Sequence, residues 1–303
     1  MNTTQKGAVL LAIAALLGGL AKTAYSDSSA NIKGTQAVYG NIPPDQIEFL
    51  STGDRIKSVA ASGSMMEIWE TLEHGERVEC LDCIPAVEPL LYDANPRTRE
   101  IAAWWLRRRV FGVFGPGEAY ERTLKTLASD GDAKKRAYAA YARGEFLVAP
   151  GAEACANAIA NDKDATVREA AASALGRMNI DFNGAIAKAL TDVEPKVKLA
   201  AIKSAGRINT FNDTTTVSAL LADGNATVRK RAAELLEKSK PASAVPALLA
   251  IAKADADAGA RNAACHALGV IRDASARATL EDVAKNDPNG LVRDQAQIAL
   301  RRL

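Results

Sequence analysis

The sequence predicts an all-α, right-handed solenoid of about seven helix pairs that follows an irregular helical N-terminal unit. Three observations carry this prediction. A stretch of about fifteen residues recurs along most of the chain, and each copy holds an aspartate and a basic residue at fixed spacing. Aromatic residues make up only 5% of the 303 residues while alanine is abundant, which favours closely packed helices over sheet.

The repeat is clearest in DKDATVREAAASALG (162–176) and DADAGARNAACHALG (255–269). When the copies are aligned on one basic residue, the steps between them are 37, 32, 30, 31, 32 and 32 residues. An aspartate stands six positions before every basic anchor. The anchors are Arg99, Arg136, Arg168, Lys198, Arg229, Arg261 and Arg293, and the aspartates are Asp93, Asp130, Asp162, Asp192, Asp223, Asp255 and Asp287.

Each copy is predicted to be a helix pair. A first helix such as VPALLAIAK (245–253) ends in the turn that holds the aspartate. The second helix follows and is apolar one position before its anchor and three and seven positions after it, which places the apolar side chains on one face. Neither helix can bury that face alone, so we expect neighbouring pairs to stack. The recurring Gly144, Gly176, Gly206 and Gly269 indicate tight helix ends.

Over residues 81–303 this pattern resembles HEAT-repeat proteins, most closely the short bacterial HEAT-like repeats of the phycobilisome-lyase type. The resemblance rests on the Asp–x5–Arg spacing, the A-A-x-A-L-G ending and the period. It implies that the aspartates and basic anchors form a ladder between successive repeats. Lys198 in place of arginine and Glu237 in place of glycine depart from the pattern.

The N-terminal segment predicts export. Residues 1–26 contain MNTTQK, then the apolar run GAVLLAIAALLGGL, then Ala24-Tyr25-Ser26, which is the order of a secretory signal peptide. An uncleaved membrane anchor is the alternative, although the apolar run is short for a bilayer. We therefore expect a periplasmic or secreted protein with no membrane span after cleavage. Residues 27–45 are predicted to be a flexible linker, 46–80 an irregular helical cap, and 81–303 the solenoid.

Charge narrows the range of partners. Cleavage would remove two lysines and no acid, leaving 36 basic and 36 acidic residues. A balanced chain gives no reason to expect nucleic acid or an anionic membrane as the main partner, so a protein partner is predicted.

The sequence predicts no catalytic residues, no metal site and no cofactor, and hence that the protein is not an enzyme. The two histidines, His74 and His266, lie far apart along the repeats. No common nucleophile, phosphate-loop or zinc-protease motif occurs, and the chain has no His-Glu dipeptide of the kind that holds iron in HEAT-type hydroxylases.

Cys80 and Cys83 lie just before the first regular repeat, in ECLDCIPAVEPLL (79–91). A structural disulfide is the favoured interpretation in an oxidising compartment. A redox-active pair at a helix N-terminus and a metal site are the alternatives. Cys155 and Cys265 are predicted to be small buried hydrophobic residues.

The resemblance implies that the second helices line the concave face, and the main binding site is predicted near the N-terminal end of that face. Five positions after the anchor, the second helices carry a mostly polar column that ends in two aromatic residues, Trp104 and Tyr141. Exposed aromatics with arginine are typical of interface hot spots. The predicted binding residues are Trp104, Tyr141, Arg107, Arg108, Phe111 and Phe114. The predicted function is a cell-envelope scaffold for a protein partner; a redox accessory protein using Cys80 and Cys83, or a structural subunit of an envelope assembly, are the alternatives.

Overall fold

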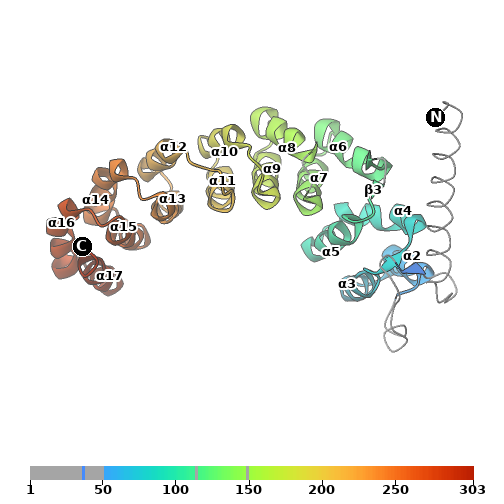
Figure 1. The fold of residues 1–303 in the computed structure, drawn as a ribbon, viewed down its shortest axis with the longest axis horizontal. Coiled ribbons are helices and arrows are strands. Elements are labelled where there is room, and N and C mark those ends of the chain that lie inside the picture. Colours follow the sequence, from blue (N-terminus) through green and yellow to red (C-terminus); the bar gives the residue numbers. More distant parts are fainter. Residues whose placement is uncertain (1–35, 38–50, 113–114, 148–149) are drawn as a thin grey trace, which may run out of the picture. The chain divides into compact units, whose positions relative to one another are not determined.

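The computed structural model describes residues 36–37, 51–112, 115–147 and 150–303 (Figure 1). It divides the chain into two compact units, Met1–Gly115 and Pro116–Leu303. The predicted signal peptide (1–26) and most of the predicted linker (27–45) lie outside the described residues. Within the described part of the chain, no helix combines the length and the apolar character that a membrane span requires.

The first unit is built from short elements around one buried tryptophan. Trp105 is fully buried, and its indole Nε1 donates a hydrogen bond to the Gly75 carbonyl oxygen at 3.1 Å. The buried Arg109 guanidinium lies 3.8 Å from the centroid of the Trp105 ring and donates to the carbonyl oxygens of Glu76 and Val78. The elements are β1 (Gln36–Ala37), α2 (Gly53–Ser62), α3 (Met65–His74), β2 (Val78–Glu79), η2 (Leu81–Cys83), α4 (Ile84–Val87), η3 (Glu88–Tyr92), α5 (Pro96–Leu106) and β3 (Phe111–Gly112), with β1 antiparallel to β2.

These contacts explain why the compact units do not divide at the predicted limit between residues 80 and 81. The helix that carries the first anchor, α5, packs against α3 and the η3 turn. Trp105 of α5 and Arg109, which follows this helix, donate hydrogen bonds to the carbonyl oxygens of Gly75 and Glu76. The sequence assigns these two residues to the N-terminal cap. The first helix pair therefore shares a core with the irregular helices, and the division follows the long connection after α5.

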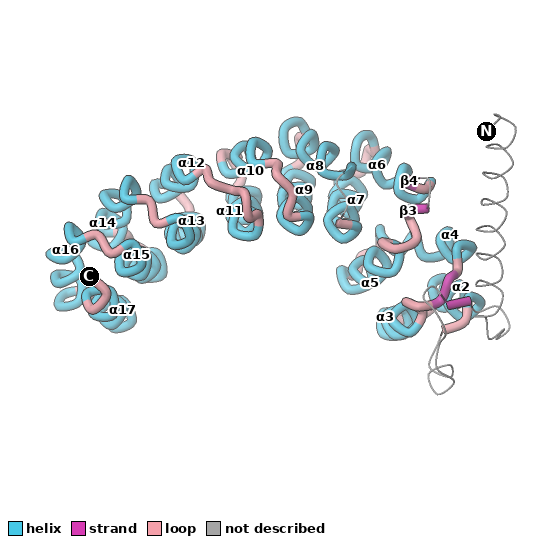
Figure 2. The backbone as a smooth tube through the Cα atoms, in the orientation of Figure 1, coloured by secondary structure: helices cyan, strands magenta, loops and turns pink. Residues whose placement is uncertain are grey.

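The second unit is a curved row of helix pairs (Figures 1 and 2). The second helices α7, α9, α11, α13, α15 and α17 form its inner row, and the first helices form its outer row. The prediction of an all-α solenoid is confirmed. The elements are β4 (Gly115–Pro116), α6 (Glu118–Ser129), α7 (Ala133–Phe146), α8 (Pro150–Asn161), α9 (Ala165–Met178), α10 (Asn183–Leu190), α11 (Pro195–Arg207), α12 (Thr214–Ala219), η4 (Leu220–Ala222), α13 (Ala226–Ser239), η5 (Ala242–Ala244), α14 (Val245–Ala254), α15 (Ala258–Ile271), η6 (Ala274–Ala276), α16 (Arg277–Asn286) and α17 (Gly290–Leu300).

The second helices begin and pack as their sequence dictates. Asp132, Asp164, Asn225, Asp257 and Asn289 cap the N-termini of five of them, and each side chain accepts a backbone N–H from the first turn. The apolar positions around each anchor are almost all buried. The core of this unit therefore runs between the two rows of helices.

The recurring glycines lie in the last turns of the second helices, where they let neighbouring helices approach. A Cβ atom at Gly144 would lie 2.8 Å from the Ala174 Cα, and one at Gly269 would lie 2.7 Å from the Ala299 Cα. The prediction that these glycines serve tight helix ends is wrong. The helices α7, α9, α13 and α15 end instead in the left-handed residues Leu147, Asn179, Lys240 and Arg272.

Candidate binding surface

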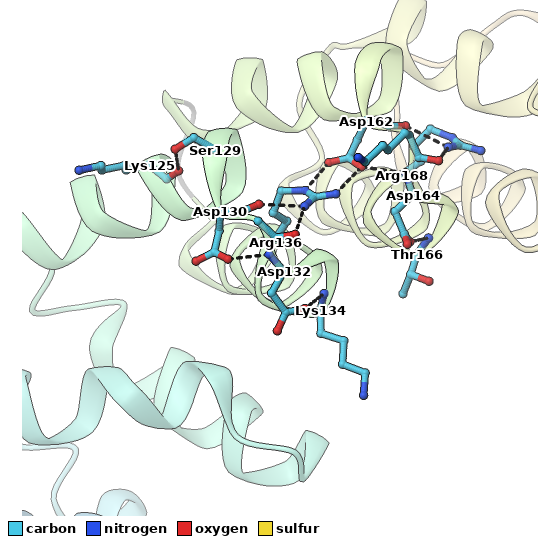
Figure 3. A network of polar contacts seen from close by, with 12 residues as sticks. Lys125, Ser129, Asp130, Asp132, Lys134, Arg136, Asp162, Asp164, Thr166 and Arg168 are labelled. Atoms are coloured by element: carbon cyan, nitrogen blue, oxygen red, sulfur yellow. Dashed lines mark hydrogen bonds and ion pairs between the residues drawn. The ribbon is translucent and has the colours of Figure 1, made fainter.

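A ladder of charge-assisted hydrogen bonds joins the repeats, and Arg136 shows its geometry (Figure 3). Its Nε and Nη2 donate to the two carboxylate oxygens of Asp162 in the next repeat, at 2.7 and 2.9 Å. Its Nη1 donates to the carbonyl oxygen of Asp130 in its own repeat at 2.8 Å. Asp162 Oδ1 also accepts the backbone N–H of Asp164 at 2.9 Å. Each rung thus fixes two turns and the junction between them.

The same link recurs through the second unit. The structure pairs Arg136 with Asp162, Arg168 with Asp192, Lys198 with Asp223, Arg229 with Asp255, and Arg261 with Asp287. At the last anchor, Arg293 donates to the Asp287 carbonyl oxygen at 2.7 Å. In the first unit, Arg99 Nη1 donates to the carbonyl oxygen of its own Asp93 at 2.6 Å. In the second unit, five rungs therefore join the anchors Arg136, Arg168, Lys198, Arg229 and Arg261 to the aspartate of the following repeat, as the resemblance implies.

The ladder carboxylates are held in their charged form. The hydrogen bond from Arg229 lowers the pKa of Asp255 and outweighs the opposing effect of burial. Burial raises the pKa of Asp162, but the hydrogen bonds from Arg136 and the backbone outweigh it, so the pKa lies below its usual value. Asp192, Asp223 and Asp287 are shifted in the same direction. These groups serve the structure, because each carboxylate accepts hydrogen bonds from a basic anchor and from a backbone N–H of its own turn.

The column five positions after the anchors lies at the surface of the second helices. Its members in the second unit, Tyr141, Ser173, Lys203, Glu234, His266 and Ile298, are all partly or fully exposed. The next position along each helix is buried in most repeats, as at Ala142, Ala174 and Ala267. The second helices, which form the inner row (Figure 1), therefore carry a strip of exposed side chains, and close contacts between these helices support it.

The structure places the predicted binding residues in both units. Trp104 is half-buried on α5 and Arg107 is partly exposed at its end, while Arg108 pairs with Glu76 at 2.7 Å. Tyr141 lies half-buried on α7 in the second unit, with the Arg177 guanidinium 6.0 Å from its ring centroid.

Phe111 belongs to β3, and Phe114 lies outside the described residues. That all six residues form one site remains a prediction.

Cys80 and Cys83 are joined by a disulfide, with Cα atoms 5.3 Å apart. Both are buried, and η2 and α4 begin at this point. Cys155 and Cys265 are free and buried, and burial raises the pKa of each thiol to about 12. Across the described residues, no group of three or more metal-binding side chains comes together.

Two features of the inner row were missed by sequence reasoning. The first is a contact of His266, whose Nδ1 lies 2.7 Å from Glu237 Oε1 and whose Nε2 lies 3.4 Å from Arg302 Nη1. The second feature is a groove of about 710 Å³ between α11 and α13, beside Leu235. The signal was present in the alignment, because Leu235 is a large residue in a column that elsewhere in this unit holds alanine or serine.

The fold and its polar ladder define a class, the α-solenoids built from stacked helix pairs. Comparison with known proteins gives the type of repeat: the family model described as HEAT repeats matches residues 214–301. Residues 214–301 are therefore similar to HEAT repeats. A search of curated proteins finds no match.

Solved structures of helical-repeat proteins match over most of the chain. An Escherichia coli protein, YibA, is 19% identical and matches over 82% of this chain and 92% of its own, with a TM-score of 0.56. Kap95p, solved with RanGDP, is 14% identical and has a TM-score of 0.57, over 82% of this chain and 38% of its own. At these identities the likeness concerns the fold.

One match corrects a prediction. Human deoxyhypusine hydroxylase matches at 17% identity over 82% of this chain and 95% of its own, with a TM-score of 0.37. The prediction that this protein is not an enzyme is therefore corrected, since an enzyme is among the solved structures that match this chain. The match is too distant to transfer that activity.

Proposed function

We propose that the protein is exported and acts as a scaffold that binds a protein partner along the exposed strip of its second helices. The observation that carries the proposal is a difference in regularity between the residues of this strip and the ladder and buried residues that support it. The strip varies from Tyr141 through Lys203 to Ile298, whereas the ladder and the small buried residues repeat. A surface that varies on a regular, closely packed support is typical of repeat proteins that bind partners.

Two further elements of the proposal come from the sequence. The signal-like segment of residues 1–26 supports export to the cell envelope or beyond. Trp104 on α5 and Tyr141 on α7 are proposed as aromatic contacts, each on its own unit, because half-exposed aromatic side chains contribute strongly to protein interfaces.

Site-specific photo-crosslinking in cells of the source organism tests the proposal. A photoreactive amino acid is placed at Ser173 or Lys203 on the second helices, and at Lys125 or Lys285 on the first helices as matched exposed controls. We expect a discrete crosslinked protein from the second-helix positions alone. Equal crosslinking from both rows, or none from the second helices, would overturn the proposed surface. Fractionation of the same cells tests export.

A further inference from the structure

The junction between α11 and α13 is less closely packed than those at which a glycine of one second helix contacts an alanine or serine of the next. A Cβ atom at Gly176 would lie 2.5 Å from the Cβ of Ser204, so α9 and α11 are in close contact. At Gly206 the facing residue is Leu235, and an added Cβ would lie 3.6 Å from its Cδ1. A leucine side chain cannot fit where alanine or serine fits elsewhere, so a groove opens between α11 and α13.

The floor of this groove is apolar. Leu199 and Ile202 of α11 and Leu235 of α13 line it, and its volume is about 710 Å³. Leu235 also lines a neighbouring cavity of about 290 Å³, which contains Phe211 and Val217. Because only two helices form the walls of the groove, a small molecule in it would keep one side in water. A longer segment could cover the floor and extend along the strip.

The rim of the groove is positively charged. Lys203 and Lys238 are both exposed, and no carboxylate among the described residues lies within ion-pair distance of either ammonium group. Lys238 Nζ instead lies 3.4 Å from the Gly206 carbonyl oxygen. The one carboxylate that lines the groove, Glu234, pairs with Arg231 at 2.6 Å. Two lysines therefore flank an apolar floor without a compensating negative charge.

We propose that the α11–α13 groove binds an acidic amphipathic helix of a partner protein. Apolar side chains at helical spacing would pack on Leu199, Ile202 and Leu235, and flanking carboxylates would bind Lys203 and Lys238. The inference rests on the proposed function and adds to it the place and the chemistry of the contact.

The test uses a fluorescein-labelled helical peptide of about 18 residues, with leucine on one face and glutamate on both flanks. Fluorescence anisotropy measures its binding to the purified protein and to the Lys203→Glu/Lys238→Glu variant. We expect the variant to bind about tenfold more weakly or worse. A peptide with lysine in place of the glutamates should show the opposite preference and bind the variant better.

Two variants provide controls. Lys125→Glu/Lys285→Glu makes the same change in net charge on the first helices and should bind the acidic peptide as the unmodified protein does. Leu235→Ala restores the small residue of the other repeats and should weaken binding by narrowing the groove. Circular dichroism confirms that each variant is folded.

The outcomes separate this inference from the proposed function. Equal binding by the unmodified protein and the Lys203→Glu/Lys238→Glu variant, or a preference of the unmodified protein for the basic peptide, overturns the acidic-helix inference. If the crosslink from Ser173 to a partner persists at full strength in the Lys203→Glu/Lys238→Glu variant, the scaffold proposal stands and the groove is not its site. Loss of the Ser173 crosslink in that variant, with the crosslink retained in the Lys125→Glu/Lys285→Glu variant, supports both.

Discussion

Removing one carboxylate of the ladder should destabilise the second unit strongly. Asp255→Ala deletes the acceptors of two Arg229 hydrogen bonds, both 2.6 Å, and of the Asp257 backbone N–H at 2.9 Å. Breaking a buried pair costs about 3–5 kcal/mol because the remaining charge is left unpaired. The Asp255 side chain is only 5% exposed but that of Arg229 is 16% exposed, so water can partly solvate the guanidinium. We therefore expect a loss of about 2–4 kcal/mol.

The structure also predicts a graded series. Asp223→Ala should cost less than Asp255→Ala, because Lys198 reaches Asp223 through one nitrogen atom whereas an arginine uses two. Asp294→Ala is the matched control, since this exposed aspartate lies outside the ladder, and it should change stability by less than about 0.5 kcal/mol.

Urea unfolding followed by circular dichroism measures the series. Because repeat arrays can unfold in segments, hydrogen exchange across α13 and α15 is measured in parallel. Equal, small losses for Asp255→Ala and Asp294→Ala would refute the ladder as a source of stability. A loss of exchange protection confined to other repeats would also contradict the reasoning.

Three further predictions follow from the same contacts. Lys198→Arg should raise the free energy of unfolding by about 0.5–1.5 kcal/mol in urea titrations, because an arginine there can also donate to the Asp192 carbonyl oxygen, as the other anchors do to theirs. Lys240→Gly should stabilise by about 0.5–1 kcal/mol by relieving a left-handed residue with a φ of 51°, and a lower urea midpoint would contradict this. Thiol titration should find no reactive cysteine in the native protein, two after denaturation without reductant (Cys155 and Cys265) and four with reductant; four without reductant would show that the disulfide is absent.

The ladder also predicts the acid dependence of stability. The carboxylates of Asp162, Asp192, Asp223, Asp255 and Asp287 have folded-state pKa values lowered below the usual value of about 3.9. Their contribution is therefore complete above that value and is lost as pH falls through the lower folded-state pKa values. Thermal unfolding temperatures should be nearly constant from about pH 5 to 7 and drop below about pH 4. An Asp255→Ala variant should show a shallower drop.

The sequence predicted the solenoid because each repeat makes the same contacts. The Asp–x5–Arg spacing encodes the turn bond within a repeat and the carboxylate bond to the next one, so the geometry at Arg136 could be expected at Arg261. The division between the two units could not be expected in this way. It depends on Trp105 reaching the Gly75 carbonyl oxygen, a contact between an anchor helix and an irregular segment with no repeated pattern.

The candidate site was harder to predict, because it depends on which residue faces which across a helix junction. The alignment shows glycine at 206 and leucine at 235 in different columns and different repeats. Only the packing of α11 against α13 reveals that they meet and leave a groove. Likewise, the alignment shows only that Glu237 replaces a recurring glycine. In the structure its carboxylate, on α13, contacts His266 on α15.

These departures occur where the repeat can tolerate them. The ladder occupies the turns, and the glycine contacts occupy the last turns of the inner helices. A change such as Leu235 widens one junction but leaves in place the rung across that junction, from Lys198 to Asp223, and the next rung, from Arg229 to Asp255. Because the rungs fix how successive repeats stack, two second helices can lie further apart at one junction while the neighbouring junctions stay closely packed. Residues that interrupt the repeat on the inner row, rather than those that maintain it, are therefore where partner specificity should be sought by mutation first.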